Sequence, residues 1–441
     1  MMRHYFQLLA AMLDQCLVGT EQYKCWLAAE ATDFVRFNRS AIRQAGHVRQ
    51  AILSLDLIDG RRHASSVLTL AGDIERDQPV VARAVATLRA QLADLPEDPH
   101  LLLPVAAVSS EHILASRLPA SADMVDQVLA AAHGLDLVGI LASGPIYRGF
   151  ASSNGQRNWH ESATFNLDWS LYQSRDKAVK SSYAGTEWDG TAFAQRFAAA
   201  VAQLALLGRA PVTVPAGAYR AYLAPAALHE IIGMLNWDGL SEKALRTHQS
   251  SVRRMRDEGL CLHPAITLRE HTAAGIAPDF QGDGFVRSPT LTLIDSGRLS
   301  GSMVSPRTAS QYGLPTNGAD ADESMKSMDL DGGSLPMAEA LAQLGTGIWI
   351  SNLWYLNFSD RANCRITGMT RFATFWVENG EIQAPLNVMR FDESLYRLLG
   401  ENLLALTHER ELLIPNDTYL ERSTASARMP GALVRDFRFV L

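Results

Sequence analysis

Apolar residues near the start of the chain recur at the spacing of one helix face. Phe6, Leu9, Ala10 and Leu13 lie three or four residues apart, which predicts an amphipathic helix. Asp14 interrupts the apolar stretch and no small-residue cleavage site follows, so we interpret this segment as part of the mature fold rather than as a signal peptide. The same helical period predicts further helices over 76–96, 121–133 and 190–207.

Between these helices the pattern changes to alternation of apolar and polar residues. Residues 34–37 and 51–55 alternate in this way, which is typical of half-buried strands. The sequence IDGRR after the second run has Asp-Gly at its centre and predicts a hairpin turn. Residues 135–186 return to strand patterns. We therefore predict an N-terminal α+β domain over 1–208, with a mainly antiparallel sheet.

Strand patterns dominate the remainder, which we predict to be a β-rich C-terminal domain over 209–441. A helix is expected over 224–235, after a strand-like lead. Hairpin turns are expected at Asp295-Ser296-Gly297 and at Asn379-Gly380. Two more helices are expected, at 336–343 and 392–408. The Gly-, Asp- and Ser-rich segment 315–334 predicts an exposed, mobile loop.

Length and composition exclude several classes of protein. A chain of 441 residues with 47% hydrophobic and 20% charged residues is an ordinary globular chain of two or three domains. Its net charge of -7 argues against non-specific nucleic-acid binding. The chain contains no run of about 18 apolar residues, so no membrane span is expected. The four cysteines form no CxxC pair, which favours free thiols in a reducing compartment and a cytoplasmic location.

The stretch LAPAALHEIIGMLNWDG, residues 223–239, places a His-Glu pair on the central helix of the second half. Many zinc peptidases begin their active site with such a pair, and the common version repeats a His four residues after the first. Here that position is Gly233, and Met234 follows it. The pair His229-Glu230 is therefore either part of a metal site, the remnant of one, or an ordinary polar pair on a helix.

Several stretches in order resemble the TldD/PmbA (TldD/TldE) family of metallopeptidase-related proteins. They are FVRFNRSAIRQAG, ASSNGQRNWHESATFNLDWSLY, GDGFVRSPTLTLIDSGRLSGSMVSPRTASQYGLPTNG and LWYLNFSDRANCRITGMTRFATFWVENGEIQAPLNVMRF. The resemblance runs from about residue 30 to 440. It implies a dimer of two related subunits that enclose a chamber and act on unstructured peptides. In such a pair the TldD-like subunit carries zinc on a His-Glu-x-x-x-His helix plus a Cys, and the TldE-like subunit lacks the metal ligands.

This chain departs from the metal-binding pattern of the family it resembles. The first His falls on His229 and the Glu on Glu230, but the second His falls on Met234 and no Cys follows Cys364. A catalytic zinc needs three protein ligands, and a thioether is a poor one. In addition, positions 229 and 234 are about 140° apart on an ideal helix, so both could reach one metal only through a distortion such as a π-type bulge.

Other polar residues offer alternatives that the residues alone leave open. His248, Cys261, His263 and His271 could serve as different metal ligands, although their spacing matches no zinc motif. The segment SSNGQRNWHES gathers Asn154, Arg157, His160 and Glu161, which fits either a site or a polar turn between strands. Arg371 in TGMTRF could bind the C-terminal carboxylate of a peptide, or serve a structural role.

We therefore expect a non-catalytic, TldE-like subunit, a pseudoenzyme with His229 and Glu230 as vestigial metal and catalytic positions and Arg371 as a peptide contact. No cofactor is expected in this subunit, and zinc is expected in a TldD-like partner. The expected partners are a second TldD/PmbA-type subunit, in a hetero- or homodimer, and an unstructured peptide, without nucleic acid or membrane. The alternatives are a metallopeptidase with altered ligands and a homodimeric peptide-binding scaffold without proteolytic activity.

Overall fold

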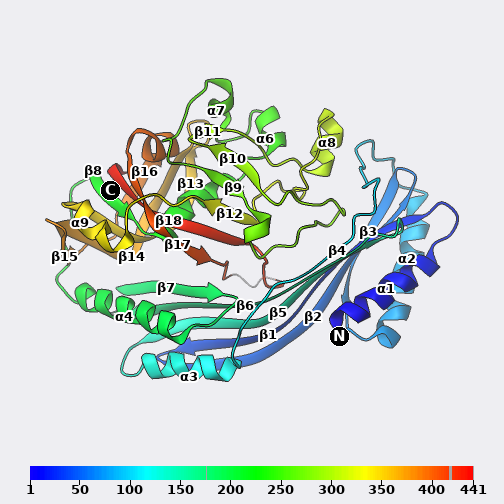
Figure 1. Cartoon of the computed structure of the whole chain (residues 1–441), viewed down its shortest axis with the longest axis horizontal. Helices are drawn as coiled ribbons and strands as arrows, with labels where there is room; N and C mark the ends of the chain where they lie inside the picture. Colours follow the sequence, from blue (N-terminus) through cyan, green and yellow to red (C-terminus); the bar gives the residue numbers. More distant parts are fainter. Residues whose placement is uncertain (175, 417–419, 441) are drawn as a thin grey trace.

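The chain folds around two β-sheets, with helices packed against both (Figure 1). The computed structural model describes residues 1–174, 176–416 and 420–440. In this part of the chain the N-terminal sheet contains seven strands and the C-terminal sheet eleven. The architecture is thus α+β, as the sequence predicts. The division into domains at 208/209 falls between the last helix of the first half and the first strand of the second, and it stays a prediction.

The N-terminal sheet is a long, curved antiparallel meander that passes beneath the C-terminal half (Figure 1). Its strand order is β3-β2-β1-β5-β6-β4, with β7 also paired to β6 and β4 parallel to β6. The hairpin turn between β2 and β3 carries Gly60 at φ 62°, at the predicted Asp-Gly position. The strands are β1 (Gln22–Asn38), β2 (Ala41–Asp59), β3 (Arg62–Leu70), β4 (Ser110–Ile113), β5 (Leu137–Ser152), β6 (Arg157–Tyr172) and β7 (Ala178–Gly185).

Two pairs of helices cover opposite ends of this sheet (Figure 1). At one end, α1 (Met2–Cys16) and α2 (Ile74–Leu92) share a core with β1, β2 and β3, and the predicted apolar face of α1 is buried in it. At the other end, α3 (Ser121–Ala131) and α4 (Gly190–Leu207) pack on Leu141, Phe165 and Trp169. The four helices that the apolar period predicts in this half are all present.

The C-terminal sheet is held together by β18, which pairs with β8, β12, β16 and β17. Its strands are β8 (Gly217–Leu223), β9 (Leu268–Glu270), β10 (Leu291–Asp295), β11 (Arg298–Leu299), β12 (Ser327–Leu330), β13 (Gly347–Asp360), β14 (Arg365–Glu378), β15 (Glu381–Pro385), β16 (Arg390–Ser394), β17 (Leu403–Leu413) and β18 (Ser426–Phe439). Its α-helices are α5 (Pro225–Gly233), α6 (Glu242–Arg246), α7 (Arg253–Asp257), α8 (Pro306–Tyr312) and α9 (Ala340–Leu344). Short 3₁₀ turns η1 (Met234–Asn236), η2 (Thr272–Ala274) and η3 (Met337–Glu339) and a π-helical turn η4 (Arg397–Glu401) complete it.

Two predictions for this half are wrong. Residues 392–408 form the end of β16, the turn η4 and the start of β17 instead of one helix. Leu395, Leu398 and Leu399 have helical spacing, are all buried and lie in the short helical stretch between the two strands. Pairing of β16 with β14 and of β17 with β18 keeps the flanking residues extended. The segment 315–334 is not simply an exposed loop, because it contains β12, whose four residues are all buried between β9 and β18.

A returning segment before β18 fastens the C-terminal half to the N-terminal sheet. The guanidinium of Arg422, 4% exposed, donates to the carbonyl oxygens of Gly144 and Thr164 and to the Thr164 hydroxyl. Arg148 on β5 donates in turn to the Arg422 carbonyl oxygen at 2.8 Å. The two halves thus share a buried polar contact. Within the described residues, no helix is long and apolar enough to cross a membrane.

Candidate functional site

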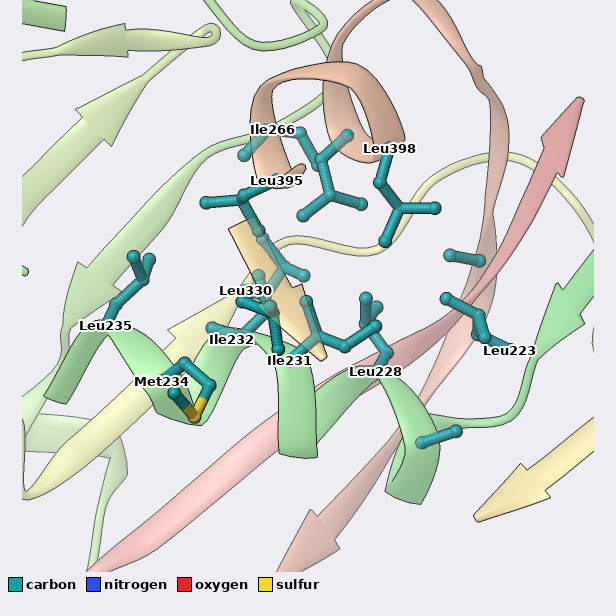
Figure 2. Packing of buried hydrophobic residues seen from close by; sticks show 14 of the residues in the cluster. Leu223, Leu228, Ile231, Ile232, Met234, Leu235, Ile266, Leu330, Leu395 and Leu398 are labelled. Carbon is teal, nitrogen blue, oxygen red and sulfur yellow. The ribbon is translucent and has the colours of Figure 1, made fainter. Parts of the chain in front are cut away.

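Helix α5 is positioned by its apolar face. Strand β8 leads directly into it, and Pro225 occupies the first helical turn, where its missing N–H removes no hydrogen bond. Leu228, Ile231 and Ile232 are buried. Figure 2 shows these three side chains pointing from the helix toward Leu330 and Leu395, across the largest core of the C-terminal half. The burial of this face fixes the rotation of α5, so that His229 and Glu230 lie on its other side.

The position expected for a second zinc ligand belongs to the core. Met234 is 3% exposed and packs within the same cluster as Ile231 and Leu235. The backbone there tightens into the 3₁₀ turn η1 after α5 ends at Gly233. This is the opposite of the widened π-type bulge that a shared metal would need. Met234 therefore points into apolar packing and does not converge with His229 on a common ligand.

His229 and Glu230 differ in exposure. His229 is half-buried and Glu230 is exposed. Loss of hydration lowers the pKa of His229, which keeps its imidazole neutral at neutral pH. Loss of hydration also raises the pKa of Glu230, and the positive charge of Lys180 partly opposes this. A raised carboxyl pKa beside a neutral imidazole leaves both groups able to exchange hydrogen bonds with a bound polar ligand.

Lys180 links α5 with the strand that carries Arg371. It lies on β7 of the N-terminal sheet, 2.7 Å from a carboxylate oxygen of Asp168, with its ammonium 5.9 Å from the ring centroid of Phe372. The guanidinium of Arg371 lies 6.0 Å from the same ring. Arg371 is exposed and pairs with Asn352 across β13 and β14. The predicted residues Glu230 and Arg371 are therefore connected through Lys180 and Phe372, which the sequence patterns did not indicate.

Backbone strain marks the same strand. Phe372 has φ 58° at a bulge where β14 slips relative to β13. Tyr355, at the next bulge along β13, has φ 53° and is 75% exposed. Positive φ is costly for residues with large side chains. Phe372 follows Arg371 directly, so the first bulge lies beside that arginine, and bulges are frequent next to active sites.

The alternative metal ligands do not assemble. Across residues 1–174, 176–416 and 420–440, no group of three or more His, Cys, Asp or Glu side chains could hold a metal ion. Cys261 is exposed, His248 lies 3.8 Å from Asp257, and the Nδ1 atom of His263 accepts the Ala265 N–H. His271 donates Nδ1–H to Asp329, which is also bound by Arg410. The donor set around His229 therefore does not fit zinc.

The polar segment SSNGQRNWHES forms the turn between β5 and β6 and the first residues of β6. Asn154 accepts hydrogen bonds from Ser152 and Gln156 within the turn, and Arg157 pairs with Asp14 of α1 at 2.6 Å. His160 is fully buried and bonds to the Ile276 carbonyl oxygen. Glu161 is half-buried and pairs in register with Tyr147. These contacts account for the four polar residues as parts of the fold.

Comparison with solved structures identifies the same fold in three proteins. TldE from Thermococcus kodakarensis is 14% identical, with a TM-score of 0.78 over 99% of this chain and 100% of that one. A proposed modulator of a DNA gyrase from Thermotoga maritima is 11% identical, with a TM-score of 0.74 over 100% of both chains. A proposed modulator of DNA gyrase from Bacteroides thetaiotaomicron is 13% identical, with a TM-score of 0.73 over 99% of this chain and 98% of that one.

The sequence itself gives a narrower result. A search of curated proteins finds no match. The family model of the PmbA/TldA metallopeptidase C-terminal domain matches residues 216–440, more than half of the chain. This range starts just before β8 and includes α5, β13, β14 and β18. The chain therefore belongs to the PmbA/TldD family of metallopeptidase-related proteins.

Proposed function

We propose that this chain is the non-catalytic, TldE-like subunit of a metalloprotease assembly that acts on unstructured peptides. The observation that carries the proposal is the burial of Met234 in the core behind α5. The helix that bears metal ligands in related subunits presents one imidazole and one carboxyl group here. The donor set does not fit zinc, so no hydrolytic step is assigned to this chain.

The role of the site is then to hold peptide. Neutral His229 and the carboxyl group of Glu230 offer hydrogen-bond donors and acceptors to peptide groups. Lys180 and Arg371 supply positive charge for a side-chain or terminal carboxylate. The exposed aromatic ring of Tyr355 adds apolar contact area. A zinc-bearing subunit of the same family would supply the hydrolysis.

The test combines metal analysis with peptide cleavage. The purified chain is dialysed against a weak chelator, its zinc content is measured, and it is incubated with an unstructured fluorogenic peptide. We expect far less than one zinc per chain and no cleavage. Addition of a TldD-type subunit with an intact His-Glu-x-x-x-His helix should give a complex in light scattering and restore cleavage. One tightly held zinc per chain together with cleavage by the chain alone would refute the proposal.

A further inference from the structure

The strand β2 has an unpaired edge over part of its length. It pairs with β1 from Ile58 back to Ala41, but its other neighbour, β3, covers only residues 51–59. A bulge at Arg43, opposite Arg36 and Phe37, interrupts the start of the strand. Residues 44–49, which we call the free edge, remain as a regular strand with no second neighbour among the described strands.

The free edge is open to solvent on both faces as well as along its side. Gln44, Ala45, Gly46, His47 and Arg49 are exposed, and Val48 is half-buried. Every second N–H and C=O group of an edge strand points away from its one partner. Six residues are a typical strand length, and no proline interrupts this run. The free edge is therefore a complete template for one added strand.

The charge of this region indicates which strand it would accept. Residues 41–50 contain Arg43, Arg49 and His47 and no carboxylate, although the whole chain carries a net charge of -7. The nearest carboxylate on β1, Asp33, is already bound by the His47 ring at 2.8 Å and the Ser121 hydroxyl at 2.6 Å. Among the described residues, Arg43 forms no side-chain hydrogen bond or ion pair, and the side chain of Arg49 forms no ion pair and donates one hydrogen bond, to the Met1 sulfur at 3.9 Å.

These observations favour a partner strand with acidic side chains. Pairing of two free edges from two copies would bring four arginines into one seam, and like charges across a strand pair are destabilising. An acidic segment instead gains main-chain hydrogen bonds and charge attraction together. We propose that residues 44–49 bind an extended acidic peptide by strand addition, with Arg43 and Arg49 selecting its carboxylates.

This inference rests on the proposed function in taking peptide as the ligand, but it uses a surface separate from α5. It names the class of peptide, rich in Asp or Glu and able to extend. The free edge would then act as a second holding site on the N-terminal sheet, while His229, Glu230 and Arg371 lie in the C-terminal half. Binding at this edge needs neither zinc nor a second subunit.

The experiment measures fluorescence anisotropy of a labelled ten-residue peptide that alternates Glu with Thr or Val. We expect saturable binding to the wild-type chain and no binding of the matching Lys peptide. The double variant Arg43→Glu/Arg49→Glu should weaken binding by about tenfold or more, since two attractions become repulsions. The control Arg61→Glu/Arg83→Glu changes the net charge equally at two other exposed arginines and should leave affinity within about twofold.

Two further measurements test the mode of binding. An acidic peptide methylated on alternate backbone nitrogens should bind at least about tenfold more weakly, because strand addition requires those N–H groups. Hydrogen exchange should show new protection at the amides of residues 44–49. Any of three results would overturn the proposal. The control variant could weaken binding as much as the double variant, the methylated peptide could bind with unchanged affinity, or the new protection could appear outside residues 44–49. The wild-type chain could instead form a dimer that is lost in Arg43→Glu/Arg49→Glu, and bind no peptide. That result would assign the free edge to a second copy of the chain and would also overturn the proposal.

The result is independent of the proposed function of the α5 site. If the chain cleaves peptides by itself, the proposed function fails while the binding measurements at the free edge still stand. If the chain is inactive alone but binds no acidic peptide, only the present inference fails.

Discussion

The Nε2 atom of His160, on β6, lies 3.1 Å from the carbonyl oxygen of Ile276 and joins the two halves of the molecule. The side chain is fully buried, and its Nδ1 atom has no hydrogen-bond partner among the described atoms. Burial, the neighbouring His112 and the charge of Arg148 together lower the pKa of His160 to about 4. The neutral imidazole is therefore the form that the folded chain accepts.

We expect stability to fall as the pH drops through the interval between the unfolded and folded pKa values of His160. Its pKa is lowered from 6.5 to about 4 on folding, so the unfolded chain binds the proton first. The contribution of neutral His160 to the free energy of unfolding is fully present above about pH 6.5. It is lost progressively toward pH 4, and the loss has a limit of roughly 3 kcal/mol. His160→Gln keeps a donor for Ile276 without titrating. Urea unfolding should show a wild-type stability that declines more steeply than that of this variant between pH 7 and pH 4; parallel profiles would contradict the assignment.

Arg422→Met should be strongly destabilising. The substitution leaves the Thr164 hydroxyl and the carbonyl oxygens of Gly144 and Thr164 without their buried donor, and the expected loss is about 3–5 kcal/mol. Arg428→Met is the control, since Arg428 is exposed and donates one long hydrogen bond to Ala274. It should change the free energy of unfolding by about 0.5 kcal/mol or less. Similar losses for both variants in denaturant melts would show that Arg422 does not anchor the returning segment.

Met234→His should destabilise the chain without creating a zinc site. An imidazole would enter an apolar cluster that contains Ile231 and Leu235 and would lack a hydrogen-bond partner, at a cost of about 2–4 kcal/mol. Met234→Leu nearly conserves volume and should cost less than about 1.5 kcal/mol. Thermal unfolding with and without zinc checks both effects. A zinc-dependent rise in the melting temperature of Met234→His would mean that His229 and position 234 can converge.

Lys180→Met should raise the pKa of Glu230 further. The positive charge of Lys180 lowers that pKa against the effect of lost hydration, so its removal leaves desolvation unopposed. Carbon-13 detected titration of the Glu230 carboxyl group measures the shift. Lys177→Met is the matched control, because Lys177 lies near the Leu386 carbonyl oxygen and does not act on Glu230. A Glu230 pKa that falls or stays constant in Lys180→Met would show that the charge of Lys180 does not act on the α5 site.

Local patterns predict the elements that pack locally. The period of Phe6, Leu9, Ala10 and Leu13 is that of α1, and all four side chains are buried against the sheet and α2. The Asp-Gly and Asn-Gly pairs likewise lie at hairpin turns, at Gly60 and at Gly380 with φ 77°. Turn chemistry and helical amphipathicity act over a few residues, so that sequence spacing alone contains the information.

Long-range pairing limits what the sequence predicts. Leu395, Leu398 and Leu399 lie in a short helical stretch, but the residues on either side are extended because β16 pairs with β14 and β17 with β18. The approach of Lys180 to Phe372 joins residues almost two hundred positions apart, on different sheets. No periodicity encodes such a contact. For this reason the sequence indicates His229, Glu230 and Arg371 separately, and Lys180 becomes visible only in the folded chain.

The position of β18 has a consequence for synthesis of the chain. This strand, residues 426–439, pairs with β8 and also with β12, β16 and β17. The N-terminal sheet can form while translation continues, whereas β8, which also pairs with β13, gains its second neighbour β18 only about two hundred residues downstream. A ribosome that stalls before residue 426 would leave the unpaired edges of β8, β12 and β17 exposed. Such nascent chains should depend on chaperones or be degraded, since unpaired strands of incomplete sheets aggregate readily.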